Sequence, residues 1–118
     1  MAKVLLVDDA AFMRMRCARL LQEEGHEVVE ASNGREAVDV YQTAHPDAVL
    51  MDITMPEMDG LEALRAIRTI DPDARVAMLT AMGQQAIVIE AIKSGARDFV
   101  VKPFERERVL SAIAKLVA

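Results

Sequence analysis

Five polar side chains in this sequence follow short apolar runs and could act together. One apolar run ends in Asp52, and similar runs end in the pair Asp8 and Asp9, in Thr80 and in Lys102. An apolar run of this length between turn signals is typical of a strand that is buried on both faces. A single aspartate in such a place usually does no more than begin a turn. Four strand ends of complementary chemistry instead favour a common site.

Three carboxylates that come close together repel one another, so at neutral pH they must take up protons or bind a cation. Oxygen ligands without His or Cys favour Mg²⁺, or Mn²⁺ in its place, over zinc. Magnesium sites built on one or two carboxylates usually include phosphate oxygens, and a carboxylate can attack phosphorus to form an acyl phosphate. The Thr80 hydroxyl and the Lys102 ammonium are then suited to bind the phosphoryl oxygens.

Each residue also has an ordinary structural role open to it. An Asp-Asp pair often caps a helix, Thr80 is a β-branched residue typical of strands, and Lys102 could be a solvated surface lysine. Their joint placement favours the functional interpretation. The sequence has no Gly-x-x-x-x-Gly-Lys loop and no Gly-x-Gly-x-x-Gly turn after its first strand. We interpret His26 and His45 as surface residues in loops.

The bulk properties indicate one cytoplasmic domain spanning residues 1–118. Hydrophobic residues make up 53% of the chain, enough for a core without disulfides or a structural metal. The net charge of −5 argues against nucleic-acid binding, which requires a basic face. The single Cys17 fits a reducing compartment and is expected in the core. No apolar run approaches the ~20 residues of a membrane span, and the start of the chain does not resemble a signal peptide.

Strand-like and helix-like segments alternate five times along the chain. The expected strands are residues 4–7, 27–31, 49–52, 76–79 and 99–101, and the expected helices are about 11–24, 33–44, 59–70, 84–94 and a last one around 109–116. This alternation predicts an α/β fold, a doubly wound five-stranded parallel sheet with helices on both faces. In such sheets the ligand crevice lies at the carboxyl ends of the strands, which would bring the polar residues together.

Local signals support these boundaries. Asn33 with Glu36 and Asp59 with Glu62 have the spacing of helix-starting capping boxes. Gly25 is expected to end the first helix in a left-handed conformation. The second strand is short and flanked by glutamates, which suits a sheet edge.

The sequence resembles the receiver domains of bacterial two-component response regulators over essentially the whole chain. The motifs that carry the resemblance are Asp8-Asp9, residues 51–56 with Asp59-Gly60 after them, Thr80-Ala81 and Lys102-Pro103-Phe104. Residues 8–15 and 81–86 are similar to stand-alone chemotaxis regulators of this family. The resemblance implies a flavodoxin-like monomer with strand order 2-1-3-4-5.

The resemblance also implies roles for the clustered residues. Asp52 would accept a phosphoryl group from a sensor histidine kinase, so that the domain modifies only itself and is otherwise no enzyme. The implied Mg²⁺ ligands are Asp8, Asp9, Asp52 and the backbone carbonyl of Thr54. Lys102 and Thr80 would contact the phosphoryl group.

A conformational switch is implied as well. Phe99 occupies the position of an aromatic side chain that turns inward when Thr80 moves. The family often has tyrosine there, so any contact of that hydroxyl with a partner is lost. The Lys102–Pro103 bond is cis in the family, and proline is the residue that allows this geometry cheaply. Thr54 and Met82 lie at positions that tune the lifetime of the phosphoryl group.

The helix expected at 84–94 has an apolar arc wider than packing on a sheet requires, so we expect Val88 and Ile92 to face outward. The family docks partners on the face formed by this helix, the fifth strand and the last helix. The predicted partner face consists of Gln84, Gln85, Val88, Phe99, Val101 and Lys115.

Several functions fit these residues. The first is a chemotaxis messenger that binds a flagellar motor switch protein. The alternatives are a phosphorelay intermediate and the receiver of a larger DNA-binding regulator. The DNA-binding alternative is less favoured, because dimerising receivers of that class usually have a basic residue where this chain has Ala112. A hydrolase of the haloacid dehalogenase type is disfavoured, because its motif would require an early strand, a cap and a second acid pair.

Overall fold

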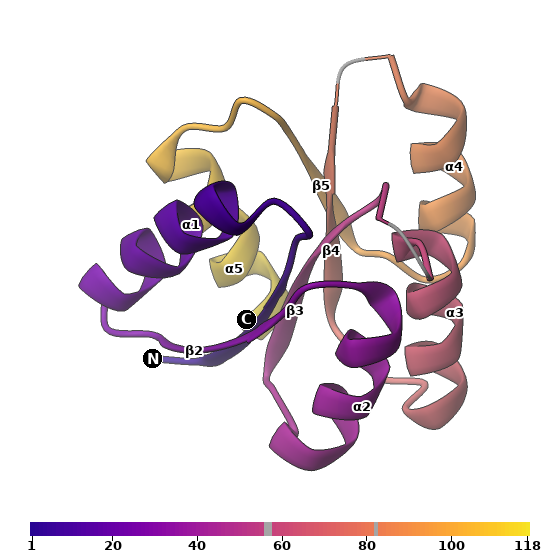
Figure 1. Ribbon diagram of the computed structural model, residues 1–118, viewed down its shortest axis with the longest axis horizontal. Coiled ribbons are helices and arrows are strands. Elements are labelled where there is room, and N and C mark those ends of the chain that lie inside the picture. Colours follow the sequence, from indigo (N-terminus) through magenta and orange to yellow (C-terminus); the bar gives the residue numbers. More distant parts are fainter. Residues whose placement is uncertain (56–57, 82) are drawn as a thin grey trace.

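The apolar runs form five parallel strands, and the segments between them form helices, in the computed structural model (Figure 1). The structure describes residues 1–55, 58–81 and 83–118. The strands are β1 (Lys3–Val7), β2 (Glu27–Ala31), β3 (Ala48–Asp52), β4 (Val76–Thr80) and β5 (Asp98–Val101). The helices are α1 (Ala11–Glu23), α2 (Gly34–Ala44), α3 (Gly60–Ile70), α4 (Gln85–Lys93) and α5 (Arg106–Val117). The strand order β2-β1-β3-β4-β5 confirms the predicted topology.

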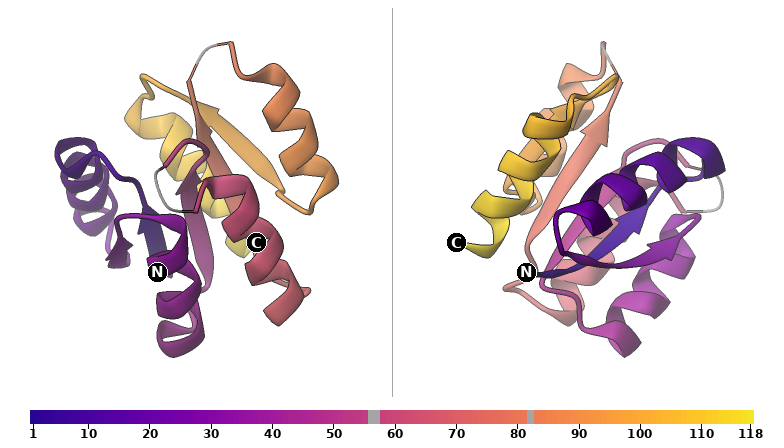
Figure 2. Two further views of the ribbon diagram at one scale, coloured as in Figure 1. Left: turned by 45° about the vertical axis from the view of Figure 1, so that its right-hand side comes forward. Right: turned by 90° about the vertical axis from the view of Figure 1, so that its left-hand side faces the viewer.

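The sheet is covered by helices on both faces, with α1 and α5 on one side and α2, α3 and α4 on the other (Figures 1 and 2). Successive strand residues point to opposite faces. In β1, for example, Leu5 packs with the α2, α3 and α4 side chains, whereas Val4 and Leu6 pack with those of α1 and α5. Two apolar layers therefore share one sheet. This explains why the central strands have continuous apolar sequences.

The two edge strands are more exposed than the central ones. In β2 only Ala31 is buried, which agrees with the edge position expected from its glutamates. In β5 the burial alternates, so that Asp98 and Val100 are buried while Phe99 and Val101 are 39% and 40% exposed. None of the described helices is long and apolar enough to cross a membrane.

The local signals act largely as predicted. The side chains of Asn33 and Asp59 accept hydrogen bonds from the backbone N–H groups three residues later, and each thereby caps a helix. The carboxylate of Glu36 reaches back to Ser32 instead of completing a capping box with Asn33. Gly25 ends α1 with a φ of 87°. Element ends elsewhere differ from the predicted ones by at most one residue, except that α5 begins at Arg106, three residues before the predicted start.

Gly60 is a point of close contact between α3 and the end of β3. Its N–H donates to the carbonyl of Ile53 at 2.7 Å. A Cβ at this position would overlap the backbone carbonyl of Asp52 and would lie 2.8 Å from the Cα of Ile53. Only glycine therefore lets the start of α3 rest against the chain beside Asp52.

We predict that Gly60→Ala lowers the free energy of unfolding by about 2–3 kcal/mol, because backbone atoms must move to admit the methyl group. Gly83→Ala is the comparison, since its methyl group would meet no atom within 4 Å and its φ of +89° costs only about 1 kcal/mol of strain. Urea denaturation measures both values. Equal losses would contradict the close contact at Gly60.

Candidate functional site

The fold brings the five predicted polar residues to one edge of the sheet. Asp8 and Asp9 directly follow β1, Asp52 and Thr80 end β3 and β4, and Lys102 directly follows β5. Carboxylate oxygens of the three aspartates lie within 4.8 Å of one another. Asp8 and Asp52 are only 2% and 8% exposed, whereas Asp9 is exposed. The result is a half-open acidic cluster with one side towards solvent.

Lys102 is part of this cluster. Its Nζ lies 2.9 Å from Asp8 Oδ2 and 3.5 Å from Asp52 Oδ2. Burial alone would lower the pKa of Lys102, but the hydrogen bond to Asp8 and the charge of Asp52 outweigh it, and the pKa is raised. The ammonium is therefore charged and placed between the two buried carboxylates.

Asp8 is oriented by the turn that begins α1. Its Oδ1 accepts from the N–H of Ala10 at 2.9 Å, and the guanidinium of Arg14 donates to its backbone carbonyl. Arg14 also binds Glu30 at 2.9 Å, which links α1 to β2. The cap residue of α1 is Ala10, so neither aspartate of the pair caps this helix. This role of Arg14 was not predictable from the sequence, because an arginine off the apolar stripe of a helix has no distinctive signal.

Asp52 carries the electrostatic strain of the cluster. Burial raises its pKa, Lys102 lowers it, and the charges of Asp8 and Asp9 raise it further, to about 6. Lys102 thus offsets only part of the cost of the buried charge. A divalent cation between the aspartates would offset the remainder.

The donor set fits Mg²⁺. All the ligand atoms offered are carboxylate oxygens, and the exposed side of the cluster leaves room for water ligands. Because the three oxygens lie within 4.8 Å of one another, these three side chains would hold the ion together. The Thr54 carbonyl as a further ligand stays a prediction.

Thr80 ends β4, the strand that pairs with β3 on the side away from β1. Thr80 is 2% exposed, and its Oγ1 shares its one proton between Gln84 Oε1 at 2.9 Å and the Ala81 carbonyl at 3.1 Å. Gln84 Nε2 donates to Thr54 Oγ1 at 2.9 Å. Gln84 was predicted only as a residue of the partner face, and these bonds were not predicted from the sequence.

A family profile described as "Response regulator receiver domain" matches residues 4–114. The chain belongs to this family. Chemotaxis protein CheY of Bacillus subtilis is 58% identical over 114 residues, covering 96% of this chain and 95% of the relative. Chemotaxis protein CheY of Thermotoga maritima is 56% identical over 115 residues, covering 97% and 96%. The receiver domain described here is therefore CheY-like.

A solved structure of similar shape is a CheX–CheY complex with BeF₃ and Mg²⁺ from Borrelia burgdorferi. It matches with a TM-score of 0.92 and 36% identity, over 98% of this chain and 89% of that chain. Receiver domains bind Mg²⁺ at an acidic pocket, and this chain has a cluster of three aspartates that could hold a metal ion. The family is a signalling receiver domain.

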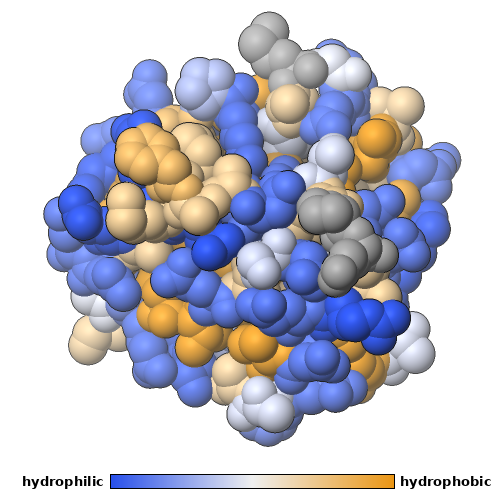
Figure 3. Space-filling view, in the orientation of Figure 1, coloured by the Kyte–Doolittle hydropathy of each residue, from blue (hydrophilic) through white to orange (hydrophobic). Residues whose placement is uncertain are grey.

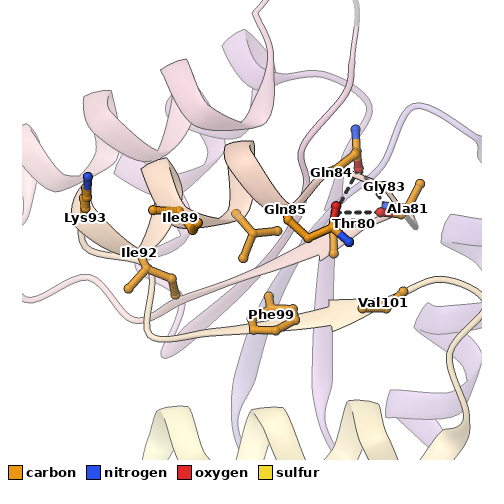
Figure 4. Close-up of a pocket in the computed structure, with 11 residues that line it drawn as sticks. Thr80, Ala81, Gly83, Gln84, Gln85, Ile89, Ile92, Lys93, Phe99 and Val101 are labelled. Carbon is orange, nitrogen blue, oxygen red and sulfur yellow. Dashed lines mark hydrogen bonds between the residues drawn. The ribbon is translucent and has the colours of Figure 1, made fainter.

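The predicted partner face of this receiver borders a cavity of about 600 Å³ between α4 and β5. The predicted residues that line it are Gln84, Gln85, Val88, Phe99 and Val101, joined by Ile89 and Ile92 (Figure 4). The expectation for Val88 was wrong in part, because Val88 is half-buried and packs against the core beneath α4. Ile92 is 45% exposed as expected, and Ile89 is more exposed, at 55%.

Lys115, the remaining residue of the predicted partner face, belongs to an ion-pair cluster. The buried carboxylate of Asp98 lies 3.0 Å from Arg108 and 3.5 Å from Lys115, and so links β5 to α5. Burial raises the pKa of Asp98, but the hydrogen bonds and charge of Arg108 outweigh it and the pKa is lowered. Asp98 was not singled out from the sequence, since nothing there distinguishes a buried aspartate from an exposed one.

The structure also describes the predicted cis bond and the two histidines. The Lys102–Pro103 bond is cis. His45 is exposed as expected, whereas His26 is half-buried and accepts from the N–H of Ala2 at 3.1 Å. Met82, predicted to tune the phosphoryl lifetime, lies outside the described residues.

Apolar side chains also reach the surface over α1 and on the α4 side of the molecule (Figure 3).

The raised pKa of Asp52 predicts a pH-dependent effect on stability without metal. The pKa of Asp52 rises from about 4 in the unfolded chain to about 6 in the folded state, so the folded state binds this proton more tightly. The stabilisation from proton binding is present at low pH and is lost as the pH rises through 6. The free energy of unfolding of Asp52→Asn should therefore exceed that of wild type by about 1–3 kcal/mol at pH 7.5, and this difference should disappear near pH 4.5. Urea denaturation in EDTA measures the difference.

Asp39→Asn is the matched control, because Asp39 is an exposed aspartate on α2. It should change stability little at either pH. If Asp52→Asn showed the same small effect as Asp39→Asn, the burial and repulsion at Asp52 would be weaker than its surroundings indicate.

Proposed function

We propose that this receiver domain is a phosphorylation-activated switch in chemotaxis. Asp52 accepts a phosphoryl group from a sensor histidine kinase, and the face around α4, β5 and α5 then binds a flagellar motor switch protein. The observation that carries the proposal is the convergence of the buried Asp52, two further carboxylates and Lys102 at one sheet edge. The similarity to chemotaxis proteins over nearly the whole chain supports the choice of pathway.

In the proposed transfer, an Asp52 carboxylate oxygen attacks the phosphorus of a phosphohistidine. A P–O bond forms while the P–N bond breaks, and the imidazole nitrogen leaves with the electron pair. The attacking group must be ionised, which a pKa of about 6 allows at neutral pH. Lys102 Nζ, 3.5 Å from Asp52 Oδ2, is close enough to bind an oxygen of the transferred group.

The cation is assigned to Asp8, Asp9, Asp52 and the Thr54 carbonyl. When bound, Mg²⁺, or Mn²⁺ as a substitute, supplies positive charge that stabilises the phosphoryl oxygens. Asp8 is prepared for this role by its buried position and by its bond to the turn before α1.

The output is proposed to follow from Thr80. Its hydroxyl donates to a phosphoryl oxygen on Asp52, and Phe99, which is 39% exposed beside the cavity, turns inward. A partner that prefers the reshaped face shifts the same equilibrium. Of the other predicted face residues, Gln85 and Val101 line the cavity, and Lys115 on α5 pairs with Asp98 of β5.

Asp52→Asn should abolish labelling by acetyl phosphate, because the amide is not a nucleophile towards phosphorus. The measurement is mass spectrometry after incubation with acetyl phosphate and Mg²⁺. Wild-type protein in EDTA should also remain unlabelled, and Asp39→Asn should label like wild type. Retained labelling of Asp52→Asn would move the acceptor to another residue.

Thr80→Ala should retain most labelling at Asp52. In the activated state, its affinity for a motor switch N-terminal peptide should be at least several-fold lower than that of wild type. Beryllofluoride with Mg²⁺ serves as the phosphoryl mimic, and calorimetry measures the affinity. Wild type should bind the peptide more tightly with the mimic than without it. Absence of binding in both states, with Asp52 still labelled, would favour the phosphorelay role instead.

A further inference from the structure

One side chain, Gln84, connects the chain segments that follow β3 and β4. Its Nε2 donates to Thr54 Oγ1 at 2.9 Å, and its Oε1 accepts from Thr80 Oγ1 at 2.9 Å and from the N–H of Ala81 at 2.7 Å. Figure 4 shows the bonds to Thr80 and Ala81 at the end of the cavity. We name these three hydrogen bonds the Gln84 bridge.

The orientation of the Gln84 amide follows from its partners. The N–H of Ala81 can only donate, so the amide oxygen and not the amide nitrogen must face it. The nitrogen then points to Thr54, whose hydroxyl oxygen accepts. Exchanging the two amide atoms would place two donors against each other. The acceptor that Thr80 meets is therefore fixed by the backbone.

The bridge competes for the only proton of the Thr80 hydroxyl. Thr80 is 2% exposed, so its hydroxyl depends on protein partners and uses Gln84 and the carbonyl of Ala81. A hydroxyl has one proton to donate. Donation to an acceptor on Asp52 therefore requires that the hydroxyl give up the bond to Gln84 Oε1 as well as the longer one to the Ala81 carbonyl.

We propose that Gln84 is a positioning residue that holds Thr80 in the inactive arrangement and so weakens binding of the phosphoryl group. This inference rests on the proposed function and names a residue that regulates it. Gln84 also lines the cavity with Phe99 and Val101 and stands at the start of α4, where its side chain makes no cap bond. Loss of the bridge thus changes the partner face directly.

The test is the affinity for beryllofluoride with Mg²⁺, followed by NMR titration. Gln84→Ala removes the bridge, and Gln84→Met does so while keeping the length of the side chain. Both variants should bind the mimic roughly three- to tenfold more tightly than wild type, as expected for removal of one competing neutral hydrogen bond. Gln42→Ala, an exposed glutamine on α2, should bind like wild type. Unchanged affinity in both Gln84 variants would overturn the proposal.

A double-mutant cycle with Thr80→Val distinguishes action through Thr80 from action through Thr54. Without the Thr80 hydroxyl there is no proton to compete for, so Gln84→Met should not alter the affinity in the Thr80→Val background. A gain that persists in that background would mean that Gln84 acts elsewhere, and the assignment to Thr80 would be wrong.

Amide exchange separates this proposal from the proposed function. The N–H of Ala81 is bonded to Gln84 Oε1, so its exchange should accelerate in Gln84→Met in the absence of any phosphoryl mimic. If wild type did not bind beryllofluoride at all, the proposed function would fail, while this exchange rate would still decide whether the bridge forms. Equal exchange in both proteins would overturn the bridge itself.

Discussion

The repulsion among three aspartates at one sheet edge is the interaction on which the rest of this structure depends. Two of them are almost completely buried, and a single ammonium group, Lys102, lies between these two. Burial raises the pKa of Asp52, Lys102 offsets this only in part, and the charges of Asp8 and Asp9 add to the rise, so that the pKa is about 6. The unmodified site is therefore electrostatically incomplete. A divalent cation, and with it a phosphoryl group, is the chemistry that such a site can accommodate.

The parallel sheet makes this arrangement possible. Its strands are buried on both faces, and their shared direction places every carboxyl end at the same edge. The two apolar layers fix the backbone from which the charged groups project, while Gly60 allows α3 to start against the end of β3. The cost of assembling like charges is thus met by packing elsewhere in the domain, since hydrophobic burial is the dominant favourable term in folding.

Much of this could be predicted from the sequence, for a physical reason. Strand periodicity and the alternation of elements determine the topology, and the topology determines which residues meet, so the edge position of Asp52 and Lys102 followed without any contact being known. Contacts that depend on side-chain direction were not predictable in this way. Arg14 binds the Asp8 carbonyl, and Val88 turns towards the core, because of neighbours that are distant in sequence. The hydrogen bonds of Gln84 were not predictable for the same reason, since hydropathy alone predicts that a glutamine at the start of a helix is exposed to solvent.

The Gln84 bridge also suggests why such a switch can be reversible. The bonds that hold Thr80 join neutral groups, whereas a bond from Thr80 to a phosphoryl oxygen would be charge-assisted and about twice as strong. The unmodified Asp52 carboxylate already interacts with Lys102, so a hydrogen bond from Thr80 to this carboxylate would be weaker than one to a phosphoryl oxygen. A difference of about 1.4 kcal/mol changes the ratio of two states tenfold, so a bridge of this strength biases the equilibrium without locking it. Removal of the phosphoryl group would then be enough to return Thr80 to Gln84.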